Sequence, residues 1–254
     1  MYGQCGITKH RPIEPVQTLI RERMMNNSQS PTLPIHGVMH SLFMGKFIRN
    51  KKYYTGEVYE WNLPTGTTCP FAKECKVSVD RVTGKFDIKK GYFRCYAASS
   101  ERFPAVREHR WKNYEYVKGG GIPALPKDCK NVRIHASGDF FSQAYFDMWV
   151  KIATENPNVN FWAFTKSINY WIVSIDKIPN NLVLTASYGG HHDSYIEQFG
   201  LKSCKVYKSV GEVPQGMPID TNDDYARMPN ITFALLDNNK ISKKKPIINE
   251  RTLF

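Results

Sequence analysis

The fold is decided by residues 132–167, which read VRIHASGDFFSQAYFDMWVKIATENPNVNFWAFTKS. The apolar runs at 132–138 and 160–167 are typical of buried strands. Between them, apolar side chains recur at helical spacing at Tyr145, Met148, Trp149, Ile152 and Ala153. A strand, a helix and a second strand in this order predict a parallel pair, because parallel neighbours need a crossover of about a dozen residues or more.

The same pattern continues on both sides of this stretch. Later strands are predicted at 181–190, 205–210 and 231–237, and an earlier one at about Gly56–Asn62. Six strands joined in this way favour an α/β fold, a parallel (β/α)6-type partial barrel with a cysteine-bearing loop after the first strand. A doubly wound sheet gives the same local signals and stays open as an alternative.

The segment that follows the first predicted strand carries Cys69, Cys75 and Cys95. Alternating apolar residues on either side of Thr83-Gly84 predict a small hairpin, inserted at about 76–94 between the second and third of these cysteines. The stretch SSERFPAVREHRWKNYEYV at 99–117 predicts a helix after the third.

The domain organisation follows from the polar composition of the two ends. Residues 1–35 are rich in Asn, Ser and Pro and predict a polar N-terminal arm. Residues 36–238 form a single α/β domain, and residues 239–254 a basic C-terminal tail. The chain has no apolar stretch of the kind that secretes or anchors a protein, so we expect a cytoplasmic location and no membrane contact.

The charge of the chain points to an anionic partner. There are 35 Lys and Arg residues against 23 Asp and Glu residues, a formal net charge of +12. A positive surface attracts nucleic acid, although general basicity is an alternative explanation. The sequence names no protein partner. The candidate nucleic-acid contacts are Arg107, Arg110, Lys112, Lys243, Lys244 and Lys245.

Cysteines in a reducing compartment are more often thiols or metal ligands than disulfides. Cys69, Cys75 and Cys95 lie within one loop region, so we predict that they bind a metal as thiolates, either iron in a cluster or zinc. The alternative is that the three are unrelated thiols. Cys5, Cys129 and Cys204 are scattered and are interpreted as packing residues, with Cys204 also a candidate fourth ligand.

Polar residues follow the predicted strands at the end where α/β proteins gather their ligands. A glycine permits close approach of a backbone, a carboxylate or lysine can bind or transfer protons, and histidine titrates near neutral pH. The alternatives to a functional role are that Asp139 caps a helix and that Lys166 is exposed to solvent. The predicted catalytic residues are Asp139, Lys166, His191 and His192, and the predicted cofactor contacts are Ser137, Gly138, Asp139 and Ser187.

Several segments resemble the bacteriophage gene product 88 family. They are TCPFAKEC, CYAASSERFPAVREHRWKN, VRIHASGDFFSQAYFDMWVKIA, NPNVNFWAFTKS and LVLTASYGGHHD. The resemblance spans roughly residues 45–238. It implies a phage protein, and therefore the cytoplasm of a host cell.

More distantly, the order of a strand, a three-cysteine loop and a second strand ending in Ser137-Gly138-Asp139 resembles radical S-adenosylmethionine enzymes. In that family three cysteines hold a [4Fe–4S] cluster with one open iron. The resemblance implies that Cys69, Cys75 and Cys95 are cluster ligands here. It also implies that Asp139 contacts the methionine end of the cofactor.

Three functional hypotheses follow. The first is a phage-type iron–sulfur enzyme that acts on nucleic acid or a nucleotide through S-adenosylmethionine. The second is a zinc-assisted or metal-independent base-modifying enzyme in which Asp139 is the nucleophile or base. The third is a basic nucleic-acid-binding phage protein without catalysis.

Overall fold

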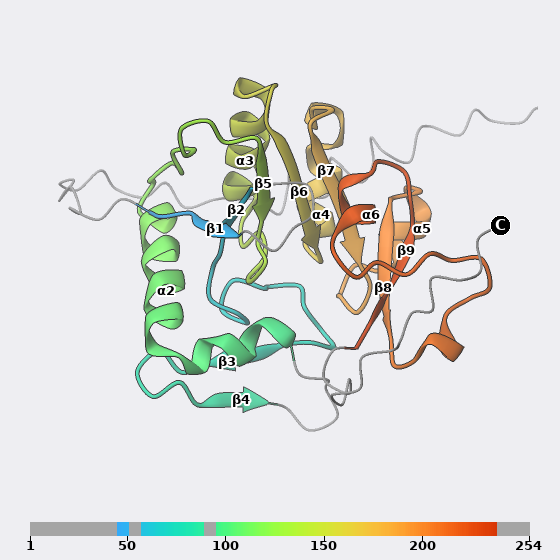
Figure 1. The fold of residues 1–254 in the computed structure, drawn as a ribbon, viewed down its shortest axis with the longest axis horizontal. Coiled ribbons are helices and arrows are strands. Elements are labelled where there is room, and N and C mark those ends of the chain that lie inside the picture. Colours follow the sequence, from blue (N-terminus) through green and yellow to red (C-terminus); the bar gives the residue numbers. More distant parts are fainter. Residues whose placement is uncertain (1–44, 51–56, 89–94, 238–254) are drawn as a thin grey trace, which may run out of the picture. The chain divides into compact units, whose positions relative to one another are not determined.

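The computed structural model describes residues 45–50, 57–88 and 95–237 (Figure 1). The predicted arm at 1–35 and the predicted tail at 239–254, with Lys243, Lys244 and Lys245, lie outside the described residues. None of the helices in the described ranges is both long and apolar enough to cross a membrane.

Seven strands of the described residues form one sheet, in the spatial order β1-β2-β5-β6-β7-β8-β9. All neighbours are parallel except β1, which is antiparallel to β2 at one edge. The strands are β1 (Ile48–Asn50), β2 (Val58–Trp61), β5 (Asn131–Ile134), β6 (Asn160–Thr165), β7 (Leu182–Ser187), β8 (Ser203–Tyr207) and β9 (Phe233–Leu236).

The predicted α/β class and its six parallel strands are confirmed, and β1 is an addition that the sequence pattern did not show. The parallel strands follow one another in space in the order of the chain, without the reversal that a doubly wound sheet contains. Sequential order is what a barrel requires, but closure toward a partial barrel remains a prediction. Several predicted strands are longer than the observed ones. The strand predicted at 132–138, for example, ends at Ile134, and a polar turn at 135–138 follows it.

Helices follow most of the parallel strands. After the cysteine loop come η1 (Tyr96–Arg102) and α2 (Pro104–Lys118), and after β5 comes α3 (Gln143–Glu155). The shorter elements are α4 (Ile168–Val173), η2 (Ile175–Lys177), α5 (Ser194–Gln198), η3 (Val210–Glu212) and α6 (Asp224–Arg227).

The main core lies between one face of the sheet and α3. Strand residues such as Val132, Ile134 and Phe161 alternate inward. Helix α3 meets them with Trp149, which belongs to the predicted apolar face, and with Phe146, which does not. Ser142 begins this helix, because its side chain accepts a hydrogen bond from the N–H of Tyr145. The opposite face of the sheet has a smaller cluster that includes Trp162, Phe233 and Ala226 of α6.

The predicted hairpin is present as β3 (Val77–Val79) and β4 (Phe86–Ile88), which pair in an antiparallel ladder. Asp80 closes its turn by accepting hydrogen bonds from the N–H groups of Val82 and Thr83. Gly84 has a φ of +70°, a conformation that glycine adopts without strain. In Figure 1 the hairpin and η1 lie at the end of the sheet toward which the parallel strands point.

Helix α2 begins later than the sequence pattern suggested. Phe103 precedes its first residue, Pro104, whose ring fixes a helical φ at a position that needs no N–H. Arg107 and Arg110 are buried on its inner face. Both were predicted as nucleic-acid contacts, and their burial removes them from the surface, whereas Lys112 is half-exposed.

Candidate functional site

The candidate site is built around the chain between β2 and η1, which carries Cys69, Cys75 and Cys95 and is called the cysteine loop. It leaves the carboxyl end of β2. Two tight turns stabilise its first part, with the N–H of Cys69 bonded to the carbonyl of Gly66 and the hydroxyl of Thr68 bonded to the carbonyl of Pro64. The N–H of Ala72 donates to the carbonyl of Cys69. The loop is thus an ordered structure with its own backbone hydrogen bonds.

The segment Ser137-Gly138 holds the first part of this loop. The Ser137 hydroxyl donates to the carbonyl of Leu63 at 2.8 Å, and the N–H of Leu63 donates back to the carbonyl of Ser137 at 2.9 Å. Gly138 has a φ of +88°, and a Cβ there would lie 2.6 Å from the Thr68 hydroxyl. The prediction that another group approaches the backbone closely at Gly138 is confirmed. In the structure that group is the cysteine loop.

The segment Gly189-Gly190 holds the second part of the loop. The N–H groups of Lys73 and Glu74 both donate to the carbonyl of Gly189, beside Cys75. Asp193 fixes the two glycines by accepting a hydrogen bond from each N–H, at 2.8 and 2.9 Å. The glycines of this motif therefore serve to dock the chain.

The two predicted catalytic histidines contact this docked region. His191 is exposed, and its backbone N–H donates to the carbonyl of Phe71. The ring of His192 stacks on Tyr195, with 5.4 Å between ring centroids, and also contacts Phe71 at 4.8 Å. Burial lowers the pKa of His192, so the ring is neutral at physiological pH and packs as an aromatic group.

The three predicted metal ligands lie close enough to influence one another. Burial raises the pKa of the Cys69 thiol well above its usual range, and Asp139, Cys95 and Cys75 raise it further by charge repulsion. Burial also raises the pKa of Cys75, while the Lys166 ammonium lowers it. The loop thus brings three thiols, a carboxyl group and an ammonium group into one region.

These groups do not form a finished metal site. Within the described ranges, no three His, Cys, Asp or Glu side chains are arranged so that they could hold one ion as they stand. Cys69, Cys75 and Cys95 are free thiols, each partly buried. Cys204 is fully buried on the second face of the sheet, where burial raises its pKa to about 12.

Asp139 is buried and engaged by the protein. One carboxylate oxygen accepts hydrogen bonds from the Thr165 hydroxyl at 2.6 Å and the N–H of Phe140 at 2.7 Å. The other accepts from the N–H of Lys166 at 2.8 Å. Burial raises the pKa of Asp139 to about 6, against the opposing effect of these hydrogen bonds. Asp139 therefore fixes the end of β6 and the position of Lys166.

Lys166 and Ser187 project from neighbouring strand ends and meet. The Lys166 ammonium donates to the Ser187 hydroxyl at 2.6 Å, and only 9% of the lysine is exposed. An ammonium group has three N–H donors, so this contact leaves donors for a negatively charged ligand. The two predicted residues thus form a small, largely buried cationic site.

The predicted nucleic-acid contacts on α2 divide into two kinds. Arg107 donates to the backbone carbonyls of Arg81, Val82 and Glu101, and Arg110 forms an ion pair with Glu101. These guanidinium groups are used inside the protein and do not reach a surface phosphate. Lys112 is half-exposed and forms an ion pair with Glu108 at 3.6 Å.

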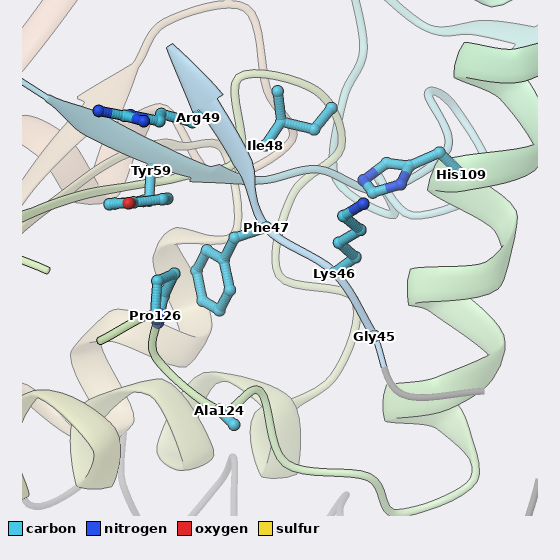
Figure 2. A pocket seen from close by; sticks show the side chains of 9 residues that line it. All are labelled: Gly45, Lys46, Phe47, Ile48, Arg49, Tyr59, His109, Ala124 and Pro126. Atoms are coloured by element: carbon cyan, nitrogen blue, oxygen red, sulfur yellow. The ribbon is translucent and has the colours of Figure 1, made fainter. Parts of the chain in front are cut away.

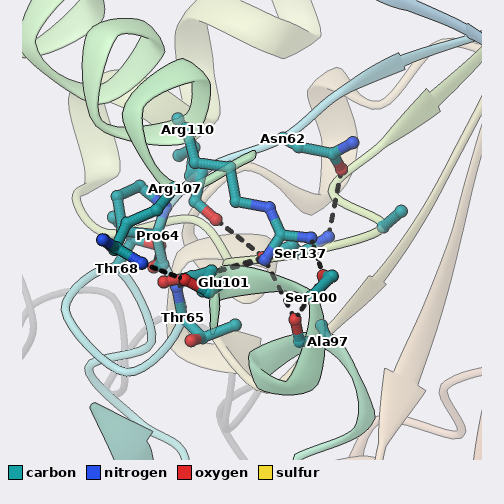
Figure 3. Close-up of polar contacts among 12 residues, drawn as sticks. Asn62, Pro64, Thr65, Thr68, Ala97, Ser100, Glu101, Arg107, Arg110 and Ser137 are labelled. Atoms are coloured by element: carbon teal, nitrogen blue, oxygen red, sulfur yellow. Dashed lines mark hydrogen bonds and ion pairs between the residues drawn. The ribbon is translucent and has the colours of Figure 1, made fainter. Parts of the chain in front are cut away.

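Sequence reasoning missed Glu101, which Figure 3 shows at the centre of the polar contacts between the cysteine loop, η1 and α2. Its carboxylate accepts from the backbone N–H of Thr65 and is 0% exposed. Glu101 stands beside Arg102 in a charged stretch, which reads locally as a solvated surface. No short-range pattern distinguishes it from an exposed glutamate.

A separate cavity of about 630 Å³ lies beside the edge strand β1. Figure 2 shows Phe47, Tyr59 and Pro126 on its walls, with Lys46 and His109 near each other at one side. None of the predicted site residues lines it. Its first lining residue, Gly45, adjoins chain that lies outside the described residues.

The fold and the site together define an α/β protein with a thiol-bearing loop docked on the carboxyl edge of a parallel sheet. The family model described as Gene product 88 matches residues 45–249, which is more than half of the chain. The protein therefore belongs to the Gene product 88 family, as the resemblance of its motifs predicted.

Two related proteins come from bacteriophages. The Gene 88 protein of Mycobacterium phage L5 is 46% identical over 28% of this chain and 38% of its own length. The Gene 88 protein of Mycobacterium phage D29 is 30% identical over the same shares. The chain therefore covers well under two thirds of either relative. No solved structure matches this protein.

We expect Gly138→Ala to destabilise the protein by about 2–4 kcal/mol, because a Cβ there combines a left-handed backbone conformation with a clash against Leu63 and Thr68. Urea unfolding measures the change. Gly211→Ala is the control, because nothing lies within 4 Å of a Cβ at that position. Equal stability of the two variants would show that the cysteine loop is not docked at Gly138.

Proposed function

We propose that this protein binds an iron–sulfur cluster through Cys69, Cys75 and Cys95 and uses it, with S-adenosylmethionine, on a nucleotide or nucleic acid. The observation that carries the proposal is that Cys69 and Cys75 lie near Cys95, Asp139 and Lys166, close enough for these groups to affect the pKa values of the two thiols. The loop that carries them leaves the carboxyl edge of the sheet, where α/β enzymes place their chemistry.

The donor set fits such a group. The thiols of Cys69 and Cys75 stay protonated without a cation, because burial and charge repulsion from neighbouring thiolates and the Asp139 carboxylate raise their pKa values. A bound cation reverses this preference and releases the protons. Three sulfur ligands leave a coordination position for a second molecule, and the cluster would supply an electron there.

Lys166 and Ser187 would hold the carboxylate or phosphate of that second molecule. Their hydrogen bond lies at the ends of β6 and β7, and Lys166 is close enough to Cys75 to lower the pKa of that thiol. Asp139 would act by fixing Lys166 rather than by attacking a substrate, since three hydrogen bonds already stabilise its carboxylate. This geometry supports the iron–sulfur proposal better than Asp139 as a nucleophile.

A nucleic-acid substrate is proposed from charge. The formal net charge is +12, and Lys73 and Lys76 are exposed on either side of Cys75. A polyanion that approaches the thiols would meet these two ammonium groups first.

Anaerobically purified protein is expected to contain iron and acid-labile sulfide. Replacing any one of Cys69, Cys75 or Cys95 with Ser should remove most of both, because two sulfurs do not hold a cluster firmly. Elemental analysis and visible absorption make the measurement. Cys129→Ser is the control, since that buried thiol donates to the carbonyl of Asn131, away from the loop. Stoichiometric zinc without iron would show that the cysteines form a zinc site and not a cluster. Absence of both metals would refute the proposal.

Lys166→Gln is expected to weaken S-adenosylmethionine binding at least tenfold, because a hydrogen bond from a charged group contributes about 1.5–3 kcal/mol. Isothermal titration of the metal-loaded protein measures the affinity. Lys205→Gln, an exposed lysine of β8, is the matched control. Equal affinities for the two variants would remove Lys166 from the binding site.

Single-stranded oligonucleotide binding is expected to weaken as salt rises. The double change Lys73→Gln and Lys76→Gln should reduce the slope of log affinity against log salt by about 1.4, because each lost phosphate contact contributes about 0.7. Lys127→Gln with Lys130→Gln is the control, since these exposed lysines precede β5 at the amino end of the sheet. A slope that changes equally in both double variants would indicate general attraction and not a site at the thiols.

A further inference from the structure

A buried carboxylate joins the segments that carry the first and the third thiol. Oε1 of Glu101 lies 2.7 Å from Nη1 of Arg110 and accepts a hydrogen bond of 2.8 Å from the N–H of Thr65. Thr65 precedes Cys69 by four residues, and Glu101 follows Cys95 by six. One oxygen atom therefore links two residues that are 36 positions apart in the sequence (Figure 3).

Helix α2 holds this carboxylate in place. Arg110 also donates to the carbonyl of Ala97 at 3.0 Å and to the hydroxyl of Ser100 at 2.8 Å. Arg107 donates to the carbonyl of Glu101 at 2.6 Å and, with its other nitrogens, to the carbonyls of Arg81 and Val82 in the hairpin. The rigid helix thereby fixes both η1 and the hairpin between Cys75 and Cys95.

Stability alone does not require an ion pair at this position. Two buried charges lose their hydration, and a well-packed apolar pair of similar volume often gives equal or greater stability. An apolar pair would offer no acceptor to the N–H of Thr65, however. The acceptor is what the carboxylate adds, and it acts on the loop that carries Cys69.

We propose that Glu101 is a positioning residue, which sets the separation of the Cys69 and Cys95 thiols so that they bind one thiophilic ligand together. The inference rests on the proposed function in taking these thiols as the site. It concerns how the thiols are arranged, and it holds for any ligand that needs two sulfur atoms at once.

The test uses the full-length, metal-free protein and phenylarsine oxide, whose arsenic forms bonds to two neighbouring thiols with release of one water molecule. Two double variants lack the ion pair equally and differ in the acceptor for Thr65. Glu101→Gln with Arg110→Met retains an amide oxygen, whereas Glu101→Leu with Arg110→Met has none. We expect the leucine variant to bind the arsenical about tenfold more weakly than the glutamine variant, because one buried hydrogen bond is lost. Equal affinity of the two would overturn the proposal.

A second comparison covers the case in which the leucine variant does not fold. Glu101→Asp retains the charge for Arg110 but withdraws the carboxylate by one methylene group, and we expect at least threefold weaker arsenical binding. Glu115→Asp is the control, since Glu115 of α2 pairs with Arg81 at an exposed position. Equal affinity of these two variants would also overturn the proposal.

Two further measurements separate this proposal from the proposed function. The variant with Ser at positions 69, 75 and 95 gives the background from the remaining cysteines. Arsenical binding that depends on Glu101 in a protein that takes up neither iron nor zinc would support the positioning role and refute the iron–sulfur function.

Discussion

The docking of the cysteine loop onto the strand ends is the constraint on which the rest of the site depends. The backbone of Leu63 exchanges hydrogen bonds with Ser137, and the backbone around Glu74 bonds to Gly189. Gly138 leaves room for Leu63 and Thr68, and both Gly138 and Gly189 have a positive φ, which glycine adopts without strain. These hydrogen bonds give the irregular loop partners for N–H and carbonyl groups that a sheet or helix would otherwise pair.

Docking also creates the electrostatic character of the site. The loop covers Asp139, whose pKa rises to about 6 as water is excluded, and it brings Cys69 beside that carboxyl group. Thr165 and the backbone of Lys166 offset part of the cost by hydrogen bonding to the carboxylate. The Lys166 ammonium is a positive charge near Cys75, and the hydrogen bond from the Lys166 N–H to Asp139 helps to fix its position.

The interior arginines of α2 follow from the irregular structure around them. The hairpin turn and η1 present carbonyl groups that no ladder or helix satisfies, and a guanidinium group can donate to several of them at once. Arg107 satisfies carbonyls in both elements. Two residues that contribute to a basic composition are thus used for internal support, and the net charge overstates how many cations on this helix face solvent.

The sequence by itself determined the six parallel strands, helix α3, the hairpin and the presence of glycine where chains approach closely. In the strands and the helix, apolar residues recur every two to four positions, because every such position faces the core. Only the tertiary structure decided that His192 contacts the ring of Phe71, that Asp139 fixes Lys166 and that Glu101 reaches Thr65. The reason is physical: these contacts join residues that distant segments bring together, and neither residue's own neighbours specify the partner it will meet.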